Sequence, residues 1–171
     1  MGFKKTSDTI AISFGIVESA IDTFTEEQVS LQLDVLNNEI FVVLGIDLDP
    51  TCPTNDPSQN TQTQMSLTTT SQNAVALLSN SNCLAEERIN IRQEVGGAGA
   101  VSPVLFRASN GSTPFATADY IGIIATNDFF VQIQGSNNAV TQTGTGRVWG
   151  YRAKADAASY AALVQSEVLS S

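Results

Sequence analysis

Alternation of apolar and polar residues with a period of two is the feature that most restricts how this chain can fold. Residues 29–35 place Val29, Leu31 and Leu33 on one face, with polar residues between them. Side chains alternate between the two faces of a strand, so this pattern predicts a strand with one buried face.

A second strand is expected directly after this one. Residues 39–49 are apolar through their middle, which indicates a strand buried on both faces. Asn37 and Asn38 lie between the two segments, and adjacent asparagines favour a tight turn. The two segments are therefore predicted to pair as a β-hairpin.

The same periodicity recurs along the rest of the chain. Strands are expected within residues 61–70, 87–95, 101–109, 119–135 (two strands) and 146–155. The inward residues of these strands are expected to include Met65, Leu67, Ile89, Ile91, Phe129, Val131 and Ile133, with Gln132 and Gln134 facing outward. Ser, Thr, Asn and Gln make up about a third of the chain, a composition that suits exposed strand faces and loops.

The two ends of the chain differ from this pattern. Residues 1–8 are expected to form a flexible or interface arm, followed by a strand from Ile10 to about Gly15 and a short second element. Residues 156–171 change to helical spacing, and Asp156 is suited to cap the helix. The residues that recur at helical spacing there are Tyr160, Leu163, Val164 and Glu167.

These elements define the expected fold class. About eight strands follow one another without the crossover helices that a parallel sheet requires. We expect an all-β fold, an antiparallel β-sandwich or single jelly roll with a short C-terminal helix. Residues 1–171 are expected to form one domain, because no linker or internal repeat divides them.

Charge and hydropathy exclude several kinds of partner. The net charge of −9 argues against direct binding of nucleic acid through a basic surface. Only Lys4 and Lys5 form a basic pair, which is too few charges for a genome-binding arm. No segment approaches the roughly 20 apolar residues of a membrane-spanning helix, so no transmembrane segment is expected.

The sequence offers little for catalysis. It contains no histidine, which excludes Ser–His–Asp and Cys–His catalysis and every His-ligated metal site. Adjacent glutamates such as Glu26 and Glu27 point to opposite faces of a strand, so they are poorly placed to share a substrate. We therefore expect a protein that is not an enzyme and needs no cofactor, with calcium as the one metal considered.

Three aspartates form the calcium candidate. Asp47 and Asp49 share one face of a strand and precede a loop that carries Asp56. Carboxylate and backbone oxygens are calcium ligands, although solvated aspartates beside a turn are the commoner situation.

Two further pairs of residues leave alternatives open. Cys52 and Cys83 lie in polar, turn-rich contexts, and they either form a disulfide or remain free thiols in a reducing compartment. Trp149 and Tyr151 lie two residues apart on a strand, where they either pack at a core or subunit interface or stack on a ligand such as a sugar ring.

The layout of the chain resembles small single-jelly-roll viral capsid proteins in length, strand count and polar loops. Its last segment, GRVWGYRAKADAASYAALVQSEVLSS (residues 146–171), is similar to the C-terminal region of coat proteins from small environmental viruses. The resemblance implies a self-assembling capsid subunit in a virion, made in the host cytoplasm. Its implied partners are further copies of itself and other virion proteins. The alternative is a carbohydrate-binding or adhesion module, with Trp149, Tyr151 and the Asp47–Asp49 region as its site.

Overall fold

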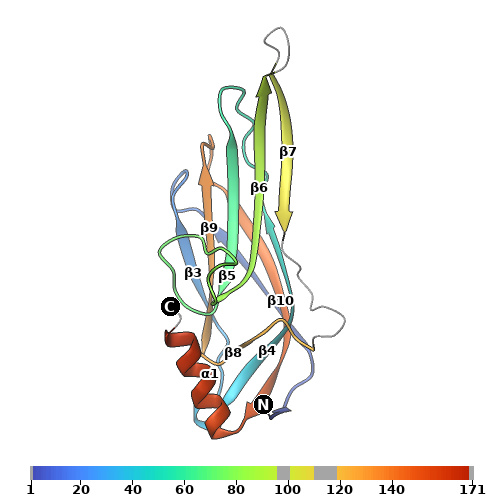
Figure 1. Cartoon of the computed structure of the whole chain (residues 1–171), viewed down its shortest axis with the longest axis vertical. Helices are drawn as coiled ribbons and strands as arrows, with labels where there is room; N and C mark the ends of the chain where they lie inside the picture. The colour runs from blue at the N-terminus through green and yellow to red at the C-terminus, as the bar shows by residue number, and fades with distance from the viewer. Residues whose placement is uncertain (1, 96–100, 110–118, 170–171) are drawn as a thin grey trace.

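The computed structural model describes residues 2–95, 101–109 and 119–169. These residues form strands, one short 3-10 helix and one α-helix (Figure 1). The strands are β1 (Phe3–Lys5), β2 (Ile10–Val17), β3 (Thr25–Ser30), β4 (Glu39–Pro50), β5 (Thr61–Thr68), β6 (Cys83–Val95), β7 (Val101–Ser109), β8 (Gly122–Ile124), β9 (Asp128–Ser136) and β10 (Thr143–Ala155). The helices are η1 (Val35–Asn37) and α1 (Ala157–Leu169).

The strands form two antiparallel sheets. In sheet A, β10 lies between β4 and the two N-terminal strands β1 and β2, and β8 extends the far side of β4. Sheet B has the order β3–β9–β5–β6–β7. From β2 to β5 and from β7 to β10 the chain changes sheet at every connection, which winds it into a jelly roll. The predicted fold class is confirmed, and the described residues form ten strands where about eight were expected.

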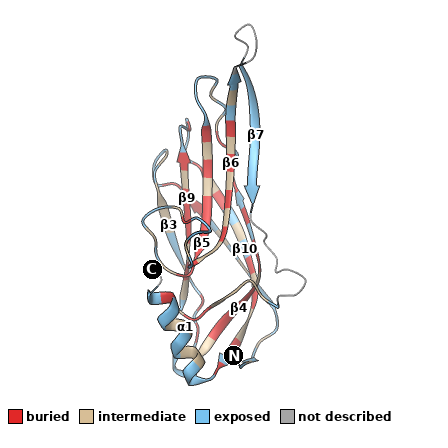
Figure 2. Cartoon of the chain, in the orientation of Figure 1, coloured by how far each residue is buried: buried red, intermediate tan, exposed pale blue. Residues whose placement is uncertain are grey.

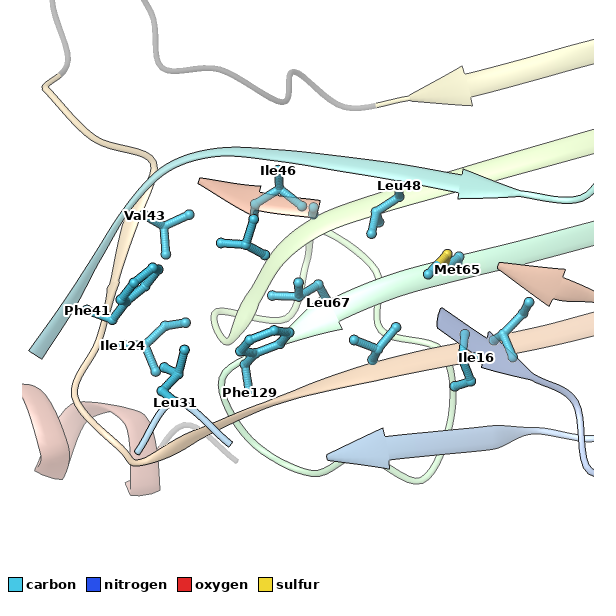
Figure 3. Packing of buried hydrophobic residues seen from close by; sticks show 14 of the residues in the cluster. Ile16, Leu31, Phe41, Val43, Ile46, Leu48, Met65, Leu67, Ile124 and Phe129 are labelled. Carbon is cyan, nitrogen blue, oxygen red and sulfur yellow. The ribbon is translucent and has the colours of Figure 1, made fainter. Parts of the chain in front are cut away.

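The main hydrophobic core fills the space between the two sheets (Figure 3). The alternation read from the sequence is confirmed on β5, β6 and β9. The predicted inward residues Met65, Leu67, Ile89, Ile91, Phe129, Val131 and Ile133 are all buried. Phe129 also makes an edge-to-face contact with Phe14 of β2, with ring centroids 5.6 Å apart, so it ties sheet B to sheet A.

The predicted hairpin between residues 29–35 and 39–49 is wrong. β3 ends at Ser30 and pairs with β9 of sheet B, whereas β4 lies in sheet A. Leu31 and Leu33 are buried as their spacing predicted, but they lie on the segment that crosses between the sheets. The alternation of apolar and polar residues there reflects the burial of these two side chains, and it does not mark a pair of hydrogen-bonded strands.

The N-terminal residues belong to sheet A. Phe3–Lys5, part of the predicted arm, forms β1 and pairs with the end of β10. β2 continues past the predicted end at Gly15 to Val17 and pairs with the first part of β10. The long strand β10 thus pairs with both N-terminal strands, β1 and β2, along the same edge.

Helix α1 covers the outer face of sheet A at one end of the sandwich (Figure 1). Asp156 caps it as predicted, because its carboxylate accepts hydrogen bonds from the backbone N–H (2.9 Å) and the hydroxyl (2.7 Å) of Ser159. Its apolar side packs on a second, smaller core built from β4 and β10. The helix residues there are Tyr160, Leu163 and Val164, and the buried sheet residues are Ile40, Val42, Ala153 and Ala155.

Candidate functional site

Strand β7 is the most exposed part of the sandwich. Among the described residues it lies at the outer edge of sheet B and pairs with β6 alone. All nine of its residues are exposed (Figure 2). Four of them are large and apolar, with exposed fractions from 37% to 55%: Val101, Val104, Leu105 and Phe106.

The ribbon formed by β6 and β7 also projects past the neighbouring strands, at the end away from α1 (Figure 1). Long, exposed apolar edge strands are rare on soluble monomers, because their free backbone groups and side chains attract another strand. We therefore treat β7 as the candidate functional surface.

One charged residue on β7 is anchored to the sandwich. The Nε of Arg107 donates a hydrogen bond to Glu87, whose side chain is buried on β6. A guanidinium nitrogen of Arg107 also lies 3.9 Å from Asp49 of β4. The hydrogen bond to Glu87 raises the pKa of Arg107, and the charge of Glu87 is matched within the chain.

Arg107 lies at an open flank of the sandwich. β8 pairs only with residues 41–43 of β4, so within the described chain no strand covers the rest of that edge. A hollow of about 260 Å³ opens between this part of β4 and the β6–β7 ribbon. Asp47, Asp49, Glu87 and Arg107 are among the residues that line it.

The predicted stacking residue Trp149 lies on the outer face of sheet A. Its neighbour Val148 points into the core, so Trp149 points away from it. Trp149 lines a hollow of about 370 Å³ together with Asp47, Asp49 and Arg147. The guanidinium carbon of Arg147 lies 5.7 Å from the Trp149 ring centroid, a cation–π contact.

Tyr151 shares that face but has a different environment. It packs against the small core beneath α1, and the Nζ of Lys5 lies 4.8 Å from its ring centroid. Trp149 and Tyr151 therefore do not form a single surface on which a ligand could stack. Trp149 borders an open hollow, whereas Tyr151 joins the packing of the N-terminal strand β1.

Asp56 is not brought to the hollow that Asp47 and Asp49 line. Its carboxylate accepts hydrogen bonds from the backbone and hydroxyl of Ser58 and from the side chain of Gln59, and the bonds from Ser58 chiefly lower the pKa of Asp56. Within the residues described, no group of three or more Asp, Glu, Cys or His side chains is placed to hold a metal ion. Calcium binding stays a prediction, and the chain's own side chains give it little support.

The two cysteines are free and far apart. Cys52 borders a hollow whose lining includes Ile89 of β6. Cys83 lies six residues from Ile89 on the same strand, which corresponds to roughly 20 Å at about 3.3 Å per residue. A disulfide needs Cα atoms within about 7 Å, so the structure does not join Cys52 to Cys83.

A buried glutamate fixes the end of helix α1. The carboxylate of Glu167 accepts hydrogen bonds from the backbone N–H groups of Ala125 (2.8 Å) and Thr126 (3.1 Å). Its side chain is only 7% exposed, and this burial raises the pKa of Glu167. Helical spacing had placed Glu167 on the packed face, but nothing local indicated its backbone partners some 40 residues earlier.

Other polar residues are buried where the sequence indicated exposure. Gln132 lies on the outer face of β9, as predicted, yet it is fully buried. Its side chain hydrogen-bonds Ser66, Thr68 and Glu26, and Glu26 in turn accepts a hydrogen bond from the backbone of Gln72. The loop after β5 therefore covers this part of sheet B, an arrangement that periodicity does not reveal.

No helix among the described residues is long and apolar enough to cross a bilayer. No family model matches the chain, and no curated protein matches it in sequence. Among solved structures, the chain is weakly similar to "Trichodysplasia spinulosa-associated polyomavirus VP1", with 6% identity, a TM-score of 0.43 and coverage of 89% of this chain and 98% of that one.

It is also weakly similar to a structure titled "Desmodium yellow mottle tymovirus", with 14% identity, a TM-score of 0.30 and coverage of 88% of this chain and 90% of that one. Both similarities are similarities of backbone fold only. At these TM-scores neither carries an argument about function, and the jelly roll is assigned from the strand order itself.

Proposed function

We propose that this chain is a structural subunit of a virion coat, which assembles into a shell through contacts between copies of itself. The observation that carries the proposal is the exposed edge strand β7, with its four large apolar side chains open to solvent. Burial of such side chains gains roughly 25 cal/mol per Å². Many weak contacts of this kind add up when symmetry repeats them.

The charge of the chain limits what such a shell contacts directly. With a net charge of −9, a subunit is repelled by a nucleic acid backbone unless cations or other proteins intervene. The proposal therefore includes other virion proteins or cations between the coat and a genome. It assigns no catalytic role to the chain, and it places the assembled protein in the virion after synthesis in the host cytoplasm.

The size of the purified protein tests this proposal. Light scattering is measured across protein and salt concentrations, and the same fractions are imaged by negative-stain electron microscopy. The proposal expects rings or closed particles that accumulate with protein concentration. It also expects more assembly at higher salt, because screening weakens the repulsion between acidic subunits. A Leu105→Lys variant is expected to assemble less, since it places a charge on the apolar edge.

Carbohydrate binding is a second candidate, supported by the hollow beside Trp149. An indole ring next to Asp47, Asp49 and Arg147 offers a stacking surface together with hydrogen-bonding groups. This function predicts that the protein is retained on immobilised polysaccharide and that Trp149→Ala abolishes retention. Retention that is unchanged in Trp149→Ala would place any glycan site elsewhere.

A further inference from the structure

We propose that β7 of one copy pairs antiparallel with β7 of a second copy across a two-fold axis, which joins the two B sheets into one continuous sheet. The inference rests on the proposed function only in that copies of the chain associate. The inference adds that β7 mediates the contact, that the two β7 strands run antiparallel, and which residues lie opposite each other. Two-fold contacts between identical surfaces are the commonest kind in protein assemblies.

The backbone of β7 indicates which groups are available for this pairing. The N–H of Gln93 on β6 donates to Asn60 (2.9 Å), so it points away from β7. Pro103 lies opposite Gln93, and it therefore directs its nitrogen and carbonyl to the free edge. Alternate residues share a direction, so Leu105 and Arg107 also present their N–H and C=O groups there.

Pro103 fits this edge position, because it has no N–H to leave unpaired. It also restricts the register of a partner strand. A partner centred on Leu105 would place Arg107 opposite Pro103, and two central hydrogen bonds would be missing. A partner centred on Arg107 would set the two guanidinium groups of Arg107 directly across from each other.

Centring the two-fold axis on Phe106 separates the two Arg107 side chains and moves Pro103 to the ends of the pairing, opposite Ser109 of the other copy, so the missing hydrogen bonds no longer lie at its centre. Leu105 of each copy then lies opposite Arg107 of the other. Each of these two symmetry-related pairs exchanges two hydrogen bonds, so four are formed in all. Phe106 meets the same residue of the second copy at a non-hydrogen-bonded position, where Cα atoms lie about 4.5 Å apart. Facing aromatic residues stabilise such cross-strand pairs.

Charge favours a second copy as the occupant. Strands β6 and β7 carry three arginines (Arg88, Arg92 and Arg107) and three glutamates (Glu86, Glu87 and Glu94), so the ribbon is neutral within a chain of net charge −9. Two acidic subunits therefore meet with little charge repulsion at this ribbon. Arg107 already has its counter-charge in Glu87, so the contact leaves no unmatched charge.

Cysteine cross-linking tests the register. Phe106→Cys and Val104→Cys are made separately in the full chain with Cys52→Ser and Cys83→Ala, and each is oxidised with copper phenanthroline. The proposal expects rapid disulfide dimers for Phe106→Cys. The matched control Val104→Cys is expected to cross-link at least tenfold more slowly, because its two copies are offset by four residues, roughly 13 Å.

The pairing would be overturned if the Val104→Cys and Phe106→Cys variants cross-link at equal rates. It would also be overturned if the Phe106→Cys variant forms particles but no disulfide dimers. Either result would leave the coat proposal intact. Dimers at position 106 without larger particles would support the pairing and contradict the shell. Hydrogen exchange of the unsubstituted protein gives a second readout. Protection of the Leu105 and Arg107 amides must increase with protein concentration, and protection that is independent of concentration would also overturn the pairing.

Discussion

Glu167 Oε1 lies 2.8 Å from the backbone nitrogen of Ala125, and this hydrogen bond ties helix α1 to the segment between β8 and β9. The side-chain amide of Asn82 donates to the backbone carbonyl of Glu167 at 3.2 Å. One residue near the end of the helix thus connects it to two loops. The docking of α1 depends on this connection as well as on apolar packing.

Removal of the Glu167 carboxylate is expected to loosen α1. Glu167→Ala leaves the N–H groups of Ala125 and Thr126 without acceptors, and a buried donor without an acceptor costs about 1–3 kcal/mol. Urea unfolding measures the loss, and hydrogen exchange locates it in α1 and residues 125–126. The exposed neighbour Gln165 provides the control, because Gln165→Ala should change neither measurement. Equal protection in both variants would contradict the role of Glu167.

The same residue predicts a pH dependence. Burial raises the pKa of Glu167 above its ordinary value of 4.5, so the folded state holds this proton more tightly than the unfolded state does. The stability that Glu167 contributes is therefore largest at low pH, and it falls as the pH rises from 4.5 through the raised pKa. The unsubstituted protein should therefore lose stability relative to Glu167→Gln as the pH rises through this range. The quantity to measure is the difference between their free energies of unfolding. A difference that is constant with pH would contradict the shift.

Two phenylalanines in different environments test the assignment of core and surface. Phe129 is fully buried between the sheets, and Phe129→Ala should destabilise the protein by about 3–5 kcal/mol. Phe106 is 49% exposed on β7, and Phe106→Ala should change the stability of the dissociated subunit by less than about 0.5 kcal/mol. Denaturant unfolding at low protein concentration compares them, and similar losses in the two variants would refute the assignment.

Glycines on β10 and β2 test how closely the strands approach one another. A Cβ at Gly150 would lie 2.4 Å from the carbonyl oxygen of Val42 and against the ring of Phe41. Gly150→Ala should therefore destabilise the protein by about 1–3 kcal/mol. A Cβ at Gly15 has 3.7 Å to its nearest neighbour, so Gly15→Ala is the tolerated control. Thermal unfolding measures both, and a smaller loss at Gly150 than at Gly15 would contradict the strand packing.

The free thiols differ in reactivity. Burial chiefly raises the pKa of Cys83 to about 11, so few of its thiols are ionised at neutral pH, and the thiolate is the reactive form. Cys52 is exposed. Iodoacetamide at neutral pH should alkylate Cys52 first, with Cys83 reacting much more slowly until the chain unfolds. Peptide mass spectrometry assigns the two sites, and early labelling of Cys83 would contradict its burial.

The sequence predicts most of this fold because period-two alternation reports burial directly. Met65, Leu67, Phe129 and Ile133 are buried because one face of their strands meets the core. Strand partners are less predictable. β3 pairs with β9, about 100 residues away, and Leu31 is buried on a crossing segment, so alternation alone suggested a local hairpin that does not exist.

The candidate surface was partly predictable as well. Residues 101–109 were expected to form a strand, but their apolar side chains gave no sign that the strand lies at a sheet edge. Edge position depends on which strands lie beyond β7, and that is a property of the whole topology. Trp149 and Asp47, which only the carbohydrate-binding alternative grouped in one site, line the same hollow. The carboxylate of Asp56 instead binds Ser58 of its own loop.

Mass photometry over a dilution series gives the masses of the particles that the unsubstituted protein and Phe106→Ala form. This comparison is the sharpest test of whether copies of the chain assemble through β7. The unsubstituted protein should form large assemblies of defined mass. Phe106→Ala should begin to assemble only at a protein concentration at least several-fold higher. Monomers of both proteins at every protein and salt concentration would refute assembly of the chain into a shell, and identical assembly of the two proteins would refute a contact through β7.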